Sequence, residues 1–362
     1  MKSRIAIFHN YMDNVGGAEI VGLTLARELG ADFYSTNIDR EKIAKMGFSD
    51  INVISIGNIP INAPYRQQQA LCLFRLLKLK QKYDYYIIDG DWAMSGAVNN
   101  RPNLWYVHSP IREIWDLYRH TRQNIVSFHA RWIFDVWVMY NRYLNRKFTK
   151  YVDKIACNSQ NTMKRVEKYL KRKSEVIYPP IDTAKFKTGE AGDYWLSVNR
   201  LIGHKRIDMQ IEAFKALPNE KLIIVGSYEQ SECFLNYVNY IKSIQPSNVE
   251  ILHWVDNDKL IELYANCKGL ITTAKDEDFG MTPVEAMASG KPVIAPNEGG
   301  YRETVIDGVT GQLIKKLDID SLIESIKYVG KDTSRYKDAC LKRAKEFDTK
   351  IFISKIKEII NR

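Results

Sequence analysis

Short apolar runs alternate with helix-length segments along most of the chain, and this alternation restricts the fold more than any other feature. Residues 3–11 form one apolar run, and residues 14–35 continue with a glycine loop, an amphipathic segment and a second apolar run. Parallel strands need a crossover connection, which is usually a helix. The repeated strand–helix order therefore predicts a parallel sheet covered by helices.

The alternation occurs in two series that are separated by a seam. In the seam, residues 174–193, Pro179 and Pro180 lack amide hydrogens, and the glycine-containing remainder fits neither a strand nor a helix period. The segments of the first series continue at 51–57, 83–92, 103–110 and 154–170, and those of the second lie at 194–200, 221–227, 249–254, 269–275 and 291–296.

We therefore predict an α/β protein of two doubly wound domains that face a central cleft. The predicted domains are residues 1–178 and 191–345, and residues 346–362 are predicted to form a helix that packs back on the first domain. A chain of 362 residues is long enough for two such domains. Because doubly wound sheets bind ligands beyond the carboxyl ends of their strands, functional residues are expected there.

The composition is that of an ordinary globular chain, with 45% hydrophobic and 27% charged residues. No apolar stretch reaches the roughly 18 residues of a membrane span, and the first residues do not resemble a secretory signal, so we expect a cytoplasmic protein. The net charge of +10 predicts an anionic partner, whether nucleic acid, nucleotide phosphates or an acidic membrane face.

The cysteines are scattered and form no CxxC pair, which argues against a disulfide framework and against a zinc site. We expect them to be small buried side chains: Cys72, Cys157, Cys233, Cys267 and Cys340.

Two glutamates flank a predicted helix start in the second series. Glu277 lies in the loop after the apolar run 269–275, and Glu285 lies in the helix that follows. The amide hydrogens and the positive dipole end of a helix start favour anions. Two alternatives remain open: residues 282–285 fit a capping box that would employ Glu285, and Glu277 could be a solvated acid in a charged run.

Two cations follow the first apolar run of the second series. Arg200 and Lys205 are expected at the same sheet edge as the helix start. A guanidinium can bind two phosphate oxygens, an ammonium acts as a point charge, and together they could neutralise a diphosphate leaving group. The alternative is two ordinary surface cations.

Seven motifs in order along the chain resemble those of the retaining glycosyltransferases of family 4, which have the GT-B fold of two Rossmann-like domains. The segment "PPID" resembles mannosyltransferase-like members in particular. The motifs are "GGAE" from Gly16, "YVHSP" around His108, "NSQNT" from Asn158, "VIYPPIDTAKF" from Val176, "VNRLIGHK" from Val198, the Glu277–Glu285 pair and "GGYRETVIDGVTG" from Gly299.

The resemblance implies an acceptor-binding first domain and a second domain that binds a nucleotide sugar. Glu277 would hold hydroxyls of the transferred sugar, and Glu285 would bind the ribose. Arg200 and Lys205 would stabilise the charge that develops on the β-phosphate. No carboxylate nucleophile is established in this family, where the leaving phosphate is usually proposed to accept the acceptor's proton during front-face attack.

Further donor contacts are implied in the second domain. Backbone amides near Met281 and Thr282 would cradle the phosphates, and the backbone around residues 253–255, including Trp254 and Val255, would recognise the base.

The first domain is expected to contribute three residues. Gly16 and Gly17 would let a loop approach the sugar and diphosphate closely, although a simple tight turn is the alternative. His108 would line the sugar pocket and is grouped with the catalytic residues, against the alternative of a buried, hydrogen-bonded histidine at a strand end.

The segment "DGD", from Asp89 to Asp91, looks like the metal-binding motif of a different glycosyltransferase fold. Because a cation pair already serves the diphosphate, we expect no metal and no other cofactor, and we interpret Asp89 and Asp91 as a loop cap.

Two segments, 66–82 and 112–150, combine basic and hydrophobic side chains. This combination suits an anionic membrane interface, whereas the alternative is helices that pack their aromatic residues into the core. The aromatic members of 112–150 are Trp115, Tyr118, Phe128, Trp132, Phe134, Trp137 and Tyr143.

Together these features predict transfer of a hexose, mannose from GDP-mannose, to a lipid-linked or glycan acceptor at the cytoplasmic face of the membrane, in cell-surface polysaccharide or glycolipid synthesis. The alternatives are a UDP-hexose donor or a non-catalytic sugar- or lipid-binding protein. A dehydrogenase is disfavoured because the first turn lacks GxGxxG spacing, and no nucleic-acid partner is expected because no nucleic-acid motif is present.

Overall fold

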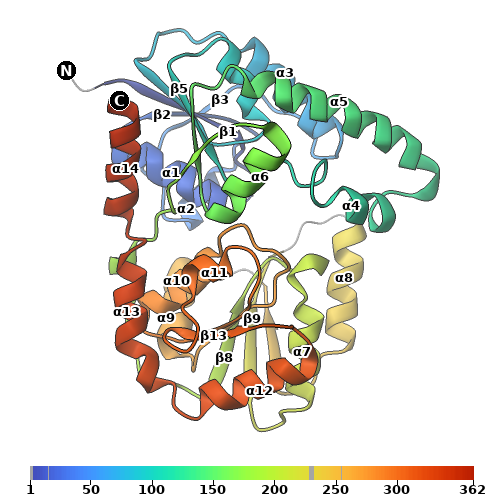
Figure 1. The fold of residues 1–362 in the computed structure, drawn as a ribbon, viewed down its shortest axis with the longest axis vertical. Helices are drawn as coiled ribbons and strands as arrows, with labels where there is room; N and C mark the ends of the chain where they lie inside the picture. Colours follow the sequence, from blue (N-terminus) through green and yellow to red (C-terminus); the bar gives the residue numbers. More distant parts are fainter. Residues whose placement is uncertain (1–2, 15, 228–231, 254) are drawn as a thin grey trace. The chain divides into compact units, whose positions relative to one another are not determined.

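The computed structural model describes residues 3–14, 16–227, 232–253 and 255–362 (Figure 1). The chain divides into two compact units. The first unit is Met1–Tyr178 together with Phe352–Arg362, and the second is Pro179–Ile351.

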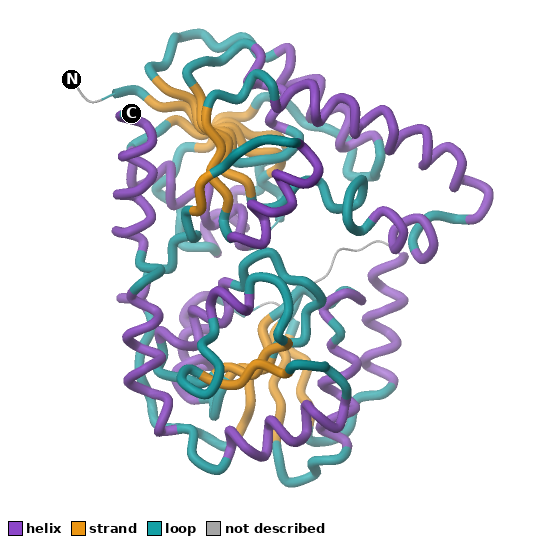
Figure 2. Tube along the Cα trace, in the orientation of Figure 1, coloured by secondary structure: helices purple, strands orange, loops and turns teal. Residues whose placement is uncertain are grey.

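The first unit contains a seven-stranded parallel sheet in the order β3-β2-β1-β4-β5-β6-β7. In this unit the strands lie between helices (Figure 2). The strands are β1 Ile5–Tyr11, β2 Asp32–Thr36, β3 Val53–Ser55, β4 Tyr85–Ile88, β5 Asn103–Val107, β6 Lys154–Cys157 and β7 Glu175–Val176. The helices are α1 Gly17–Leu29, α2 Arg40–Lys45, α3 Tyr65–Leu76, α4 Tyr118–Asn124, α5 Arg131–Thr149, α6 Gln160–Leu170 and most of α14 Thr349–Asn361, with 3₁₀ turns η1 Ala93–Val98 and η2 Phe128–Ala130.

The second unit contains a six-stranded parallel sheet in the order β10-β9-β8-β11-β12-β13. The strands are β8 Tyr194–Val198, β9 Lys221–Val225, β10 Val249–Leu252, β11 Leu270–Ile271, β12 Val293–Pro296 and β13 Gly311–Ile314. The helices are α7 Ile207–Lys215, α8 Glu232–Ser243, α9 Asn257–Asn266, α10 Met281–Ala288, α11 Tyr301–Thr304, α12 Ile319–Gly330 and α13 Lys337–Lys345, with 3₁₀ turns η3 Thr183–Lys185, η4 Gly203–Lys205 and η5 Ser334–Tyr336.

Helices on both faces of each sheet explain the apolar runs. All residues of β4 and β5 are buried, and Trp105 and Trp195 are fully enclosed. A strand covered on both faces needs an apolar run rather than an alternating pattern. The predicted α/β class with two doubly wound, Rossmann-like sheets is therefore confirmed.

Two strands, β7 and β13, were not predicted. β7 has only two residues, too few for a visible pattern. β13 starts at Gly311, which has φ of 148° and whose added Cβ would lie 1.9 Å from the carbonyl oxygen of Val293. Only glycine allows β13 to approach β12 at this point. Because glycine adds no apolar side chain to the sequence pattern, the strand could not be recognised from the sequence.

Both sheets have a switch point, where successive connections run to opposite sides. It lies between β1 and β4 in the first sheet and between β8 and β11 in the second. The loops that leave the carboxyl ends of these strands diverge, so they leave room for a ligand in each unit.

The cysteine prediction holds for three residues and is wrong for one. Cys157, Cys267 and Cys340 are buried, and burial raises the pKa of each thiol to about 12. Cys72 is exposed, because it lies on the outer side of α3. The side chain of Cys233 lies outside the described part.

Candidate functional site

Two loops at the switch point of the second sheet bring a predicted cation and a predicted carboxylate together. Lys205 follows β8 and Glu277 follows β11. The Lys205 Nζ donates a hydrogen bond to Glu277 Oε2 at 2.6 Å, and the two side chains are 14% and 20% exposed. Arg200 is exposed on the same loop as Lys205. The side chains assigned to the diphosphate and to the sugar therefore lie at one place.

Two further charged residues, which the sequence analysis missed, fix these loops. The guanidinium of Arg206 donates to the carbonyl oxygens of Thr273 and Ala274, at 2.5 and 3.2 Å, and to Glu298 Oε2 at 3.1 Å. Glu298 Oε2 also accepts the amide hydrogen of Asp276 at 3.2 Å. Arg206 and Glu298 thus hold the backbone next to Lys205 and Glu277 by hydrogen bonds.

Glycines bring the loop after β12 against the Glu277 loop. An added Cβ on Gly299, whose φ is 53°, would lie 2.3 Å from the carbonyl oxygen of Glu277. A Cβ on Gly300 would lie 2.4 Å from the Cα of Phe279, and its amide donates to the Glu277 carbonyl at 2.8 Å. Two backbones this close leave no room for side chains, which explains the glycine pair.

The helix start between the two glutamates is α10, and the capping-box interpretation is wrong. The N-cap of α10 is Gly280, with φ of 89° and no side-chain cap, so Thr282 is already inside the helix. The capping box was predicted with Thr282 as the N-cap, but the helix begins two residues earlier, after Gly280 in the left-handed conformation. The amides of Met281 and Thr282 belong to the first turn, where helical amides have no partner within the helix.

Glu285 has a different structural partner. The Tyr264 hydroxyl donates a hydrogen bond to Glu285 Oε2 at 2.7 Å. Burial raises the pKa of Glu285, and the hydrogen bond from Tyr264 acts in the opposite direction. Glu285 is therefore a half-buried carboxyl group held at one oxygen.

The residues predicted to contact the base are only partly described. Val255 is half-buried between β10 and α9, next to Asp256, which caps α9 by accepting the amide of Lys259 at 2.8 Å. Trp254 lies outside the described residues.

In the first unit, His108 follows β5 and is bound to a buried carboxylate. His108 Nε2 lies 2.8 Å from Asp89 Oδ1, and the other carboxylate oxygen, Oδ2, lies 2.8 Å from His9 Nδ1. Asp89 is fully buried, so its interpretation as a loop cap is wrong: it joins two histidines at the carboxyl ends of β1, β4 and β5. Within the described ranges, no cluster of three carboxylate, imidazole or thiol groups could hold a metal ion.

Gly16 and Gly17 stand at the start of α1. Gly16 is the N-cap, and its φ of −164° is open to any residue. Its added Cβ would meet only the flexible end of Glu19, at 2.6 Å. The conformation therefore does not by itself require glycine at 16.

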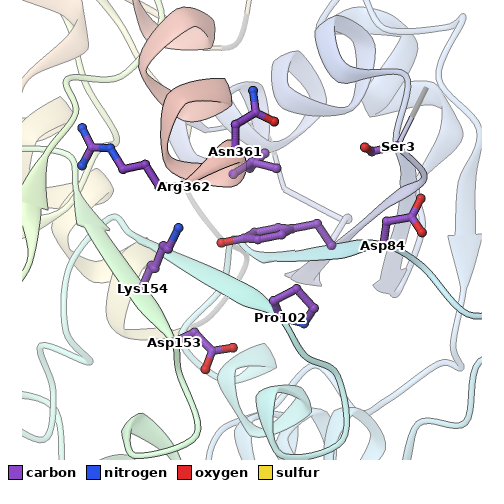
Figure 3. Close-up of a pocket in the computed structure, with 9 residues that line it drawn as sticks. Ser3, Asp84, Pro102, Asp153, Lys154, Asn361 and Arg362 are labelled. Atoms are coloured by element: carbon purple, nitrogen blue, oxygen red, sulfur yellow. The ribbon is translucent and has the colours of Figure 1, made fainter. Parts of the chain in front are cut away.

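A hollow of about 370 Å³ lies elsewhere in the first unit (Figure 3). Asp84, Pro102, Lys154 and Arg362 are among its lining residues, and they lie at the amino ends of β4, β5 and β6 or in the last residue of the chain. It contains none of the predicted site residues and lies at the sheet edge opposite His108, where doubly wound folds do not bind their ligands.

Comparison with known proteins agrees with the motifs. A model described as Glycosyltransferase Family 4 matches residues 15–185, and one described as Glycosyl transferases group 1 matches residues 180–347. Together they span most of both units.

Similar proteins are glycosyltransferases. An uncharacterized glycosyltransferase of Methanocaldococcus jannaschii is 32% identical over 56% of this chain, and the match spans 57% of that protein. The alpha-1,3/1,6-mannosyltransferase ALG2 of Dictyostelium discoideum is 26% identical over 85% of each chain. The structure of Anabaena HepE in complex with UDP and glucose shares the fold, with a TM-score of 0.78 and 20% identity over 99% of both chains.

Motif order, fold and family models lead to the same assignment, and the chain belongs to the family 4 glycosyltransferases of the GT-B fold, where it is similar to mannosyltransferases.

Proposed function

We propose that this protein is a retaining glycosyltransferase that transfers mannose from GDP-mannose to a lipid-linked or glycan acceptor, in the synthesis of a cell-surface polysaccharide or glycolipid. The observation that carries the proposal is the Lys205–Glu277 pair at the switch point of the second sheet. The relatives named ALG2 mannosyltransferase support mannose as the sugar.

The pair is suited to both of its proposed roles at once. An ammonium has three N–H donors, so Lys205 keeps two for phosphate oxygens while it holds Glu277. The carboxylate of Glu277 is an acceptor of the kind that a sugar hydroxyl can bind. Positive charge that is already fixed where negative charge develops on the leaving diphosphate lowers the barrier without reorganisation. Arg200 on the same loop adds a second cation.

Glu285 is suited to hold the ribose. Tyr264 occupies Oε2, and among the described residues Oε1 accepts no hydrogen bond. That oxygen could accept a ribose hydroxyl, while the helix start of α10 offers the amides of Met281 and Thr282 to the phosphates.

Nucleotide binding tests the proposal, and we expect GDP to raise the melting temperature more than UDP, ADP or NAD. A ligand at 100 times its Kd adds about 2.7 kcal/mol of stability, which thermal-shift measurements detect readily. If UDP raises the melting temperature more than GDP, the proposed donor becomes a UDP-hexose instead of GDP-mannose. The complex of HepE with UDP and glucose supports that donor class. A rise in melting temperature with NAD alone would contradict the proposal that the protein is a glycosyltransferase.

We further propose that the reaction needs no metal, because Lys205 and Arg200 already serve the diphosphate. EDTA should leave the release of nucleoside diphosphate from the nucleotide sugar largely unchanged. Abolition of this release by EDTA, with rescue by Mn²⁺, would show the metal proposal to be wrong.

The acceptor proposal rests on α5, which extends beyond the sheet of its unit (Figure 2). One face of α5 packs in the core through Val138, Leu144 and Phe148. The opposite face, here called the α5 outer face, consists of side chains that are each more than half exposed: Trp132, Ile133, Val136, Met139, Tyr140 and Tyr143.

The alternative of core packing holds for part of the aromatic segment, and the exposed part supports the membrane proposal. Trp115 is buried, and Tyr118, Phe134 and Trp137 pack against the core. The α5 outer face is exposed, and the exposed ammonium of Lys147 lies 5.8 Å from the centre of the Tyr143 ring. In the described residues, no helix is long and apolar enough to cross a membrane. An exposed apolar stripe with a cation beside it suits the interface of an anionic bilayer, where a lipid-linked acceptor would be found.

The substitutions Trp132→Ser and Tyr140→Ser should each weaken binding of the protein to vesicles that contain an anionic phospholipid. Burial of one large aromatic side chain is worth about 2 kcal/mol, so we expect each substitution to weaken binding at least about tenfold in a sedimentation assay. Tyr328→Ser, in the second unit, is the control because Tyr328 is also half exposed. Equal binding of wild type and the double variant would contradict the membrane proposal.

A further inference from the structure

The buried carboxylate of Asp89 joins two imidazoles, and its geometry determines which of their nitrogens carry hydrogen. Oδ1 lies 2.8 Å from His108 Nε2, and Oδ2 lies 2.8 Å from His9 Nδ1. An ionised carboxylate can only accept, so both of these nitrogens must donate. The hydrogen-bond network thus assigns the hydrogen of His108 to Nε2.

The remaining polar atom of the His108 ring is Nδ1. It makes no hydrogen bond within the part of the chain that the structure describes. The His108 side chain is 22% exposed, whereas His9 and Asp89 are 5% and 0% exposed. His108 is therefore the member of the trio that can meet a ligand, and Nδ1 is the atom left to do so.

The contacts within the trio shift the pKa values of His9 and Asp89. Burial opposes protonation of His9, but the hydrogen bond and charge of Asp89, with the charge of Glu19, outweigh it and raise the pKa of His9. Burial also opposes ionisation of Asp89, but the two histidines outweigh it and lower the pKa of Asp89. A buried ion needs such partners, and both histidines lie within hydrogen-bond distance of the carboxylate.

The backbone around the trio is built to hold the carboxylate in place. A Cβ added to Gly22 of α1 would lie 2.3 Å from Asp89 Oδ2 and 3.0 Å from the ring of Phe33. Only glycine lets α1 lie this close to Asp89. The Tyr106 ring packs edge-on against His108, with centroids 5.3 Å apart. The same carboxylate is thus contacted from α1, β1 and the end of β5.

We propose that Asp89 is a positioning residue: by accepting from His108 Nε2 it fixes the Nε2–H tautomer, so that Nδ1 is presented to accept a hydrogen bond from a sugar hydroxyl. This inference rests on the proposed function only for the identity of the ligand. The hydrogen on His108 Nε2 follows from the first unit alone.

The test is ¹⁵N NMR of the histidines in the full-length protein near neutral pH. We expect His108 to be protonated at Nε2 and bare at Nδ1. GDP-mannose, but not GDP, should shift the Nδ1 resonance. Hydrogen on Nδ1 in the wild-type protein would overturn the inference without any variant. Failure to bind a nucleotide sugar, with the expected tautomer present, would remove the proposed function but leave the tautomer assignment standing.

The variant Asp89→Asn provides a second test of the proposal. One side of the amide is a donor, so it cannot accept from both histidines, and His108 should lose its single tautomer. In a hydrolase triad, the same change of the orienting aspartate lowers kcat about 10⁴-fold through the wrong tautomer, and we expect a loss of at least 100-fold here with unchanged affinity for GDP. Asp84→Asn, at the exposed start of the same strand, is the control. Wild-type turnover in a folded Asp89→Asn protein would overturn the inference.

Discussion

Replacing Lys205 by alanine is expected to lower the release of nucleoside diphosphate from the nucleotide sugar by about two orders of magnitude or more, the usual loss for a preorganised charge stabiliser. The ammonium lies 2.6 Å from Glu277 in a half-buried site, where it is screened less than a surface charge. Arg200→Ala should lower the same rate by a similar factor. The release assay uses water as the acceptor, so it does not depend on knowing the natural one.

The matched control for Lys205→Ala is Lys215→Ala. Lys215 lies on α7 of the same unit, is 38% exposed and pairs with Glu212 on the surface. It should change neither the rate nor the melting temperature. If Lys205→Ala folds and turns over like the wild type, the assignment of the diphosphate to this loop is wrong.

The second large effect concerns the two glutamates, which should fail in different ways. Glu277→Gln should leave the affinity for free GDP nearly unchanged and lower the rate of transfer about 100-fold, because the sugar loses its charged acceptor. Glu285→Gln should instead weaken GDP binding about tenfold, since a hydrogen bond to a charged group is worth about 1.5–3 kcal/mol. The melting temperature of Glu285→Gln should change little, because the amide oxygen can still accept from Tyr264.

Calorimetric titration with GDP beside the release assay separates these effects, with Glu212→Gln on α7 as a control in the same unit. Equal losses of GDP affinity in Glu277→Gln and Glu285→Gln would contradict the separate roles for sugar and ribose. Normal GDP binding by Glu285→Gln would remove its ribose role alone.

The sequence predicted most of the fold because the central strands are buried on both faces. Runs such as those of β4 and β5 need no knowledge of their neighbours to be recognised. β13 could not be recognised in this way, because its start at Gly311 is dictated by the backbone of β12, distant in sequence. The start of α10 was missed for a related reason, since the left-handed conformation of Gly280 leaves no mark in the capping pattern.

The site was predictable only where topology brings strand ends together. Lys205 and Glu277 were expected at one sheet edge because both follow apolar runs of the same predicted parallel sheet, and they meet there. Arg206 and Glu298 appear in the sequence as ordinary charges, and only the folded loops show what they hold. The bond between His9 and Asp89 joins residues 80 positions apart, for which no local pattern exists.

The most direct test of the donor site is a crystal structure with GDP. We expect the diphosphate within about 3 Å of Lys205 Nζ and of the amides of Met281 and Thr282, with the ribose at Glu285. GDP bound instead in the hollow near Lys154 and Arg362, or at any place that leaves the Lys205–Glu277 pair without a phosphate contact, would contradict the account.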